Sequence, residues 1–177
     1  MKTKTSLFIG LLFISVNFLT AQIGKKAIPD DLNTSKIVFL KLDSAEESKD
    51  KPKDKAEKVQ VANRKKYNKN VSKANDELMV SSKKYPFVCT TAHRDEINKY
   101  KALGYKYVLD FQPFVKLREG EIRADADNTE SYPLYLSDLS NNSVYIVDYV
   151  DQYFSYEYST IIEKIFLKEV KKKYKLK

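Results

Sequence analysis

The chain contains one cysteine and one histidine, Cys89 and His93, which lie four positions apart. A cysteine thiol paired with a histidine base is a common nucleophile of thiol-dependent and hydrolytic enzymes. The pair falls where the pattern predicts that a strand ends and a helix begins, which is the usual ligand edge of an open α/β sheet. The apolar neighbours Phe87 and Val88 instead favour a small buried cysteine beside an exposed helix-start histidine. We therefore assign no catalytic residue and keep a Cys89–His93 enzyme as an alternative.

The same junction carries four polar side chains that could contact an anion. A helix N-terminus attracts negative charge, which favours such a site. The segment lacks the glycines of a phosphate-cradling loop, and its arginine comes one residue too early for a C-x5-R loop. The anion site thus stands as an alternative to a purely structural junction. Its residues would be Thr90, Thr91, His93 and Arg94.

Acidic residues cluster between positions 119 and 130. A calcium loop needs acidic or amide residues at alternate positions, a glycine at the sixth position and a glutamate at the twelfth. Asp125 and Asp127 match the start of that pattern, but the rest does not, so we interpret the segment as a solvated loop. A single cysteine and a single histidine also exclude the common zinc sites. We expect no metal and no other cofactor.

Positive charge is concentrated at the C-terminus. The net charge is +8, and residues 164–177 hold seven lysines against one glutamate. Lysine-rich helix ends associate with anionic surfaces such as lipid headgroups or acidic polysaccharide, although cations also stabilise a helix C-terminus without any partner. With 28 lysines and 4 arginines, the chain lacks the side chain that base recognition favours, so we expect no nucleic-acid partner. The candidate contact residues are Lys171, Lys172, Lys173, Lys175 and Lys177.

Residues 1–21 have the pattern of a secretory signal peptide. Lys2 and Lys4 precede an apolar run over 6–20, and Ala21 offers a small residue at a cleavage position. The run is shorter than the roughly 20 residues that a membrane span needs, so cleavage near Ala21 is favoured over a retained anchor. We expect a soluble exported protein, periplasmic or extracellular.

Apolar periodicity predicts the order β-α-β-α-β-β-β-α. This order indicates a single α/β domain, with an α+β mixed sheet of about five strands and three helices. The domain covers 36–177, follows an extended lead-in over 22–35, and contains a mobile charged loop over 43–55. The strands are expected at 36–42, 87–90, 105–111, 132–139 and 144–150, and the helices at 56–84, 94–103 and 159–174.

Five local details follow from the same patterns. Val59 is expected on the apolar stripe of the first helix, and Gly104 should end the second helix in a left-handed conformation. Asn142 lies in a tight hairpin turn. Pro133 places its strand at a sheet edge or delays the start of its ladder. Thr160 with Glu163 forms a capping box for the last helix.

Two segments carry a resemblance to known proteins. These are GYKYVLD, where a helix ends in Gly104 and an aromatic strand follows, and YLSDLSNNSVYIV, a hairpin with Asp138 before a polar turn. Together with the element order, they resemble the small periplasmic α/β domain of the TolB N-terminus and of the CsgG and LpoB families. The resemblance implies an envelope protein that works through partners, and it implies no catalytic residues.

We therefore expect an exported, non-enzymatic envelope protein that acts by binding a protein partner or a surface. Two alternatives stay open. One is the small thiol-dependent or hydrolytic enzyme centred on Cys89. The other is association with an anionic lipid or polysaccharide surface through the C-terminal lysines.

Overall fold

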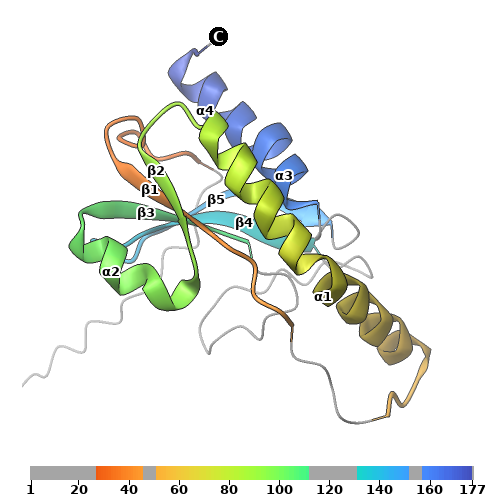
Figure 1. The fold of residues 1–177 in the computed structure, drawn as a ribbon. Coiled ribbons are helices and arrows are strands. Elements are labelled where there is room, and N and C mark those ends of the chain that lie inside the picture. The colour runs from red at the N-terminus through yellow and green to blue at the C-terminus, as the bar shows by residue number, and fades with distance from the viewer. Residues whose placement is uncertain (1–26, 46–50, 112–130, 152–156, 177) are drawn as a thin grey trace, which may run out of the picture.

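The computed structural model describes residues 27–45, 51–111, 131–151 and 157–176. They form a mixed sheet of five strands in the order β2-β1-β3-β4-β5 (Figure 1), which confirms the predicted fold class. β1 pairs in parallel with β2 and β3, while β4 runs antiparallel to both β3 and β5. The strands are β1 (Lys36–Leu40), β2 (Cys89–Ala92), β3 (Tyr105–Asp110), β4 (Ser131–Asp138) and β5 (Val144–Asp151).

Helices cover both faces of the sheet. The first is α1 (Lys55–Ser81), which continues into the 3-10 turn η1 (Ser82–Lys84). The second is η2 (Arg94–Glu96) with α2 (Ile97–Ala102). The third runs through α3 (Tyr158–Thr160), the π-helical η4 (Ile161–Phe166) and α4 (Leu167–Tyr174). Among the described residues, no helix combines the length and apolar character needed to cross a bilayer.

Alternation along β1 separates two hydrophobic layers, because successive strand residues point to opposite faces. Ile37 and Phe39 lie in the large core beneath α1 and the C-terminal helix. Val38 and Leu40 lie in a smaller cluster beneath α2. Figure 1 shows α1 and the C-terminal helix together on one side of the sheet and α2 on the other.

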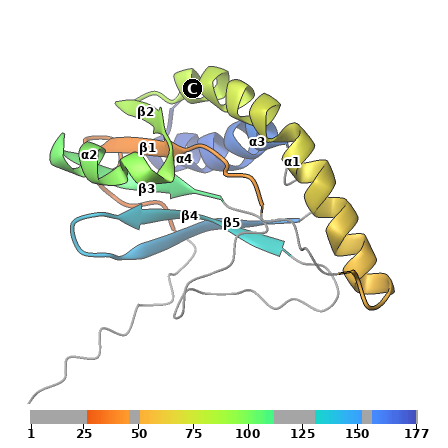
Figure 2. The ribbon, with the colours of Figure 1, turned by 60° about the horizontal axis from the view of Figure 1, so that its bottom comes forward.

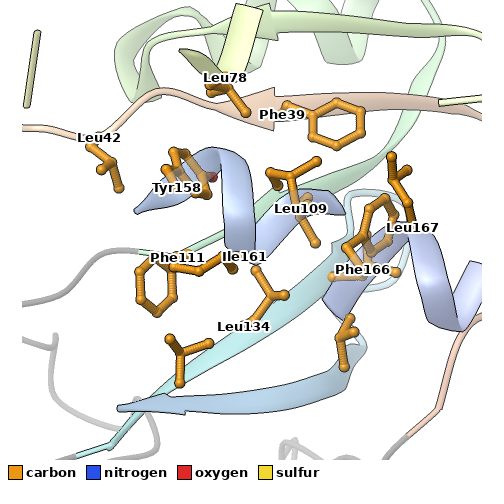
Figure 3. Close-up of a cluster of buried hydrophobic side chains, with 14 of the residues drawn as sticks. Phe39, Leu42, Leu78, Leu109, Phe111, Leu134, Tyr158, Ile161, Phe166 and Leu167 are labelled. Atoms are coloured by element: carbon orange, nitrogen blue, oxygen red, sulfur yellow. The ribbon is translucent and has the colours of Figure 1, made fainter. Parts of the chain in front are cut away.

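Three aromatic rings hold the large core together. The Phe39 ring meets Tyr85 edge-on at 5.5 Å and Phe166 edge-on at 5.6 Å, and Tyr85 stacks on Phe166 at 5.8 Å. These rings come from β1, from the segment after η1 and from η4. Figure 3 shows Phe39, Leu109 and Phe166 converging between the sheet and the C-terminal helix. The last helix is therefore part of the core and not an appendage.

The apolar stripe of α1 begins later than predicted. Tyr67, Val71 and Leu78 are buried, but Val59 is 49% exposed, so its assignment to the stripe is wrong. Figure 2 shows the reason, because the first turns of α1 extend past the ends of the strands. No sheet lies beneath Val59 to cover it.

Two asparagines on α1 hold the chain after β1. The Asn75 amide accepts from the Leu42 N–H at 2.8 Å and donates to the Leu42 carbonyl at 3.0 Å. Asn68 does the same with Ala45, at 2.8 and 2.9 Å. Each amide imitates a neighbouring strand, so residues 43–45, at the start of the predicted mobile loop, are held against α1.

The remaining local predictions have mixed outcomes. Gly104 and Asn142 adopt positive φ angles of 80° and 60°, as expected. Pro133 lies in β4, an interior strand, and of the two predicted alternatives the late start holds, because the ladder to β3 starts at Tyr135. The capping box is wrong, because the last helix begins at Tyr158 after an N-cap at Glu157, and Glu163 is bonded elsewhere.

Asp31 joins the N-terminal lead-in to the sheet. Its carboxylate accepts from Lys106 Nζ and from the Tyr107 hydroxyl, both at 2.6 Å, and from the Ser35 hydroxyl at 3.2 Å. Burial alone would raise the pKa of Asp31, but the bonds from Lys106 and Tyr107 outweigh it and lower the pKa to about 2. The ionised carboxylate therefore stabilises the fold.

We predict that Asp31→Asn lowers the free energy of unfolding at pH 7 by about 1 kcal/mol, a small value because solvent screens a half-exposed pair. The depressed pKa means that the contribution is present above pH 4 and is lost as the pH falls from about 4 towards 2. Urea unfolding at pH 7, 4 and 2.5 measures the difference from wild type. Asp76→Asn is the matched control, because Asp76 is an exposed aspartate on α1. If the two variants lowered the free energy of unfolding equally at pH 7, the ionised Asp31 carboxylate would not have the stabilising role described above.

Candidate functional site

The carboxyl ends of the three parallel strands gather charged side chains at one edge of the sheet. The chain leaves β1 towards α1 on one face and leaves β2 towards α2 on the other. Ligand sites of open α/β sheets form where the connections diverge in this way. The side chains at this edge are Asp43, His93, Arg94, Asp110 and, from β4, Tyr135.

A buried carboxylate is the centre of this group. Asp110 is only 3% exposed, and one of its oxygens accepts from Arg94 Nη2 at 2.6 Å and from the Tyr135 hydroxyl at 2.7 Å. Burial would lower the pKa of Arg94, but the charge and hydrogen bond of Asp110 raise it. The guanidinium thus stays charged and is committed to Asp110.

Two tyrosines complete the edge where β1 ends. The Tyr158 hydroxyl donates to the Leu40 carbonyl at 2.8 Å, and the Tyr67 hydroxyl donates to the Asp43 carbonyl at 3.0 Å. Burial, as the main cause, raises the pKa of both phenols, so both remain donors. The Asp43 side chain lies 3.9 Å from His93 Nδ1, with both groups about half exposed.

Chemically, the edge has the character of a structural ion cluster. Arg94 and Tyr135 bond the buried carboxylate of Asp110. Tyr67 and Tyr158 donate to backbone carbonyls. Within the described residues, no three His, Cys, Asp or Glu side chains come together in a group that could hold a metal ion. The geometry therefore supports a role in holding β1, β2, β3 and β4 together, and it assigns no reaction to the edge.

Cys89 and His93 are not brought together. The predicted strand 87–90 lies two residues later, at 89–92, so Cys89 starts β2 and His93 follows its end. Four strand residues span about 13 Å. The Cys89 thiol donates to the Ser82 carbonyl at 3.4 Å, and burial raises its pKa. A thiol with a raised pKa and a distant imidazole lacks the activation that nucleophilic catalysis needs.

The predicted anion residues are dispersed or already bonded. Thr90 and Thr91 point to opposite faces of β2, because they are adjacent in a strand. The His93 backbone N–H donates to the Glu96 carboxylate at 3.1 Å, and Arg94 is paired with Asp110. The helix start thus carries its own anion, and the four residues do not converge on one point.

The C-terminal lysines differ in their bonding. Lys171, Lys172 and Lys175 are exposed, whereas Lys173 pairs with Asp30. Lys177 and the acidic segment over 119–130 lie outside the described residues. Tyr174 fixes the end of the helix, since its hydroxyl donates to the Pro29 carbonyl at 2.6 Å and its ring packs edge-on against Phe87.

Sequence reasoning missed the ion cluster around Asp110. Its one visible signal is a charged residue ending the apolar strand YKYVLD. Its partners come from positions 16 and 25 residues away, so only the sheet pairing reveals them.

We predict that Arg94→Met destabilises the protein by about 2 to 4 kcal/mol, because it leaves the Asp110 charge buried without its main compensation. Asp110→Asn in the same chain should recover most of that loss. Urea unfolding of the two single variants and the double variant gives the coupling energy. If the destabilisations of the two single variants simply add up in the double variant, the charges of Arg94 and Asp110 do not stabilise each other.

We also predict slow labelling of Cys89 by a thiol reagent at neutral pH, at least about tenfold slower than in 8 M urea, because the thiol is half-buried with a raised pKa. Stopped-flow absorbance measures both rates. Labelling of the folded protein at the unfolded rate would show an activated, accessible thiol and revive the enzyme alternative.

Comparisons with known proteins give no match to a family model, to a curated protein or to a solved structure. The resemblance to the TolB, CsgG and LpoB domains therefore stays a prediction. Function has to be inferred from the positions and charges of the chain's own residues.

Proposed function

We propose that this protein is a non-enzymatic binding protein that acts outside the cytoplasm and holds an anionic surface against the lysines of its C-terminal helix. The single observation that carries the proposal is the two-sided character of that helix. Phe166, Leu167 and Val170 are buried in the core. The lysines on the opposite side are exposed and point away from the sheet; they are Lys164, Lys168, Lys171, Lys172 and Lys175.

Stabilisation of the helix end does not account for all of these lysines. The interaction of a cation with the helix dipole falls off within the last turn. Lys164 lies in η4 and Lys168 lies at the start of α4, both well before the end of the helix at Tyr174. The acid of α4, Glu169, is half-buried and lies to one side, so it does not interrupt the lysine face.

Anchoring makes this face a usable surface. The aromatic packing of Phe166 and the bonds of Lys173 and Tyr174 hold the helix along its length. The lysines are therefore presented from a fixed backbone, which lowers the entropy cost of binding. An exported location, expected from residues 1–21, would bring the face into contact with envelope lipids and polysaccharides.

The thiol-enzyme alternative has no comparable support. Cys89 and His93 lie at opposite ends of β2, and the pKa of the thiol is raised. A protein partner remains compatible with the same lysine face if that partner is acidic.

We predict that the Lys171→Gln/Lys172→Gln variant binds anionic vesicles and polygalacturonate several-fold more weakly than wild type in low salt, because each surface lysine contributes favourably near an anionic surface. Substitution is preferable to truncation, since truncation removes the Tyr174 anchor. Co-sedimentation in 50 mM and 500 mM salt measures the binding.

Lys99→Gln/Lys101→Gln on α2 is the matched control, with the same loss of charge on the opposite face of the sheet. It should bind nearly as wild type does. Absence of salt-sensitive binding by wild type, or equal losses in the two variants, would contradict the proposal.

A further inference from the structure

A second set of lysines lies on α1, on the side of the helix that faces away from the core. Successive helix residues are rotated by about 100°, so these lysines fall within an arc of about 100° opposite the buried stripe of Tyr67, Val71 and Leu78. All are exposed. We call them the α1 lysine stripe: Lys55, Lys58, Lys65, Lys66, Lys69 and Lys73.

The stripe is long, and no acid lies within its arc between Lys55 and Lys73, although Lys73 at its end forms an ion pair with Glu77 at 3.7 Å. From Lys55 to Lys73 it spans about 27 Å, with roughly one positive charge every 5 Å. Glu57 is the acid within this range, and it turns back to accept from the Lys53 N–H at the helix start. A row of point charges along one side of a long helix matches the shape of an extended polyanion.

The stripe lies on the same helical layer as the exposed lysines of the C-terminal helix. We call these the α4 lysines: Lys164, Lys168, Lys171, Lys172 and Lys175. α1 runs alongside the C-terminal helix in the same direction, because Glu77 bonds Ser159 and, one turn later, Ser81 bonds Glu163. The two lysine sets therefore follow one another along the outer side of this layer, as the course of α1 and α4 in Figure 1 shows.

A polar groove lies at the C-terminal end of the stripe, beside Lys73. Its volume is about 350 Å³, and it lies between α1 and α3. The lining offers an amide, hydroxyls, two carboxylates and one ammonium group that is ion-paired with Glu77, so it presents donors and acceptors for the hydroxyls of a sugar without a net positive charge of its own. The lining residues are Asn70, Lys73, Glu77, Glu157, Ser159 and Thr160.

These observations separate three kinds of polyanion. A membrane-bound helix needs a continuous apolar face towards the lipid, whereas the exposed apolar residues of α1, Val59, Met79 and Val80, lie at its two ends with the lysines between them. Single-stranded nucleic acid is bound by aromatic platforms and arginine, and neither forms part of the stripe or the groove. An acidic polysaccharide needs both spaced cations and hydroxyl-binding polar groups, and the helical layer supplies both.

We propose that the α1 lysine stripe, the groove and the α4 lysines form one elongated binding face for a single chain of acidic polysaccharide. This inference rests on the proposed function, because it names the partner of the α4 surface and extends that surface along α1. The α4 lysines alone span about 16 Å, so an oligosaccharide that reaches past the groove gains additional contacts with α1.

The test is calorimetric titration of the full chain with polygalacturonate fractions of increasing length. The affinity of the wild-type protein should rise as the polygalacturonate fraction becomes longer than the span of the α4 lysines, about 16 Å. Lys65→Gln/Lys69→Gln should weaken binding of long fractions about tenfold and leave short fractions unchanged, since avidity depends on the second contact. Lys99→Gln/Lys101→Gln is the charge-matched control and should change neither.

A groove variant tests the choice of sugar. Thr160→Val removes one hydroxyl with little change in shape, and it should weaken binding of polygalacturonate while leaving inorganic polyphosphate unchanged. Equal binding of long fractions by wild type and Lys65→Gln/Lys69→Gln would overturn the inference. The proposed function would still be tested separately, by the binding of the Lys171→Gln/Lys172→Gln variant. Tighter binding of phosphatidylglycerol vesicles or single-stranded DNA than of polygalacturonate, or no effect of Thr160→Val, would also overturn it.

Discussion

Packing of the Phe39, Tyr85 and Phe166 rings between the sheet and the helical layer fixes the orientation of both long helices. Once Phe166 is buried, helical periodicity turns the lysines of α4 towards solvent. The same core fixes the rotation of α1 about its own axis, because Tyr67, Val71 and Leu78 are buried in it together with Phe166. The charged surface of this protein is thus a consequence of where its aromatic and aliphatic side chains are buried.

Much of the fold could be predicted because it follows from local periodicity. Five strands and three helices, the turn at Asn142 and the helix stop at Gly104 each depend on residues close together in sequence. The outcome for β2 shows the limit. Its apolar residues Phe87 and Val88 precede the strand, and the register with β1 moves the strand to Cys89–Ala92. That shift of two residues separates Cys89 from His93.

The candidate sites divide in the same way. The lysine side of α4 was visible as a charge run, because a charged helix end needs no partner to be recognised. The cluster around Asp110 was not visible, since Arg94 and Tyr135 reach it only after β2, β3 and β4 are aligned. The exposure of the first turns of α1, seen at Val59, likewise depends on where the sheet ends. The Asp110 cluster and the exposure of Val59 therefore depend on the alignment and length of neighbouring elements, which local sequence patterns do not reveal.

The most direct test of the account is an NMR titration of the full chain with polygalacturonate, which locates the binding face residue by residue. The account predicts shift changes at the backbone amides of α1, α3 and α4, centred on Lys69, Thr160 and Lys171, and their loss in 500 mM salt. Shift changes centred instead on α2 or on the Arg94–Asp110 edge would contradict it.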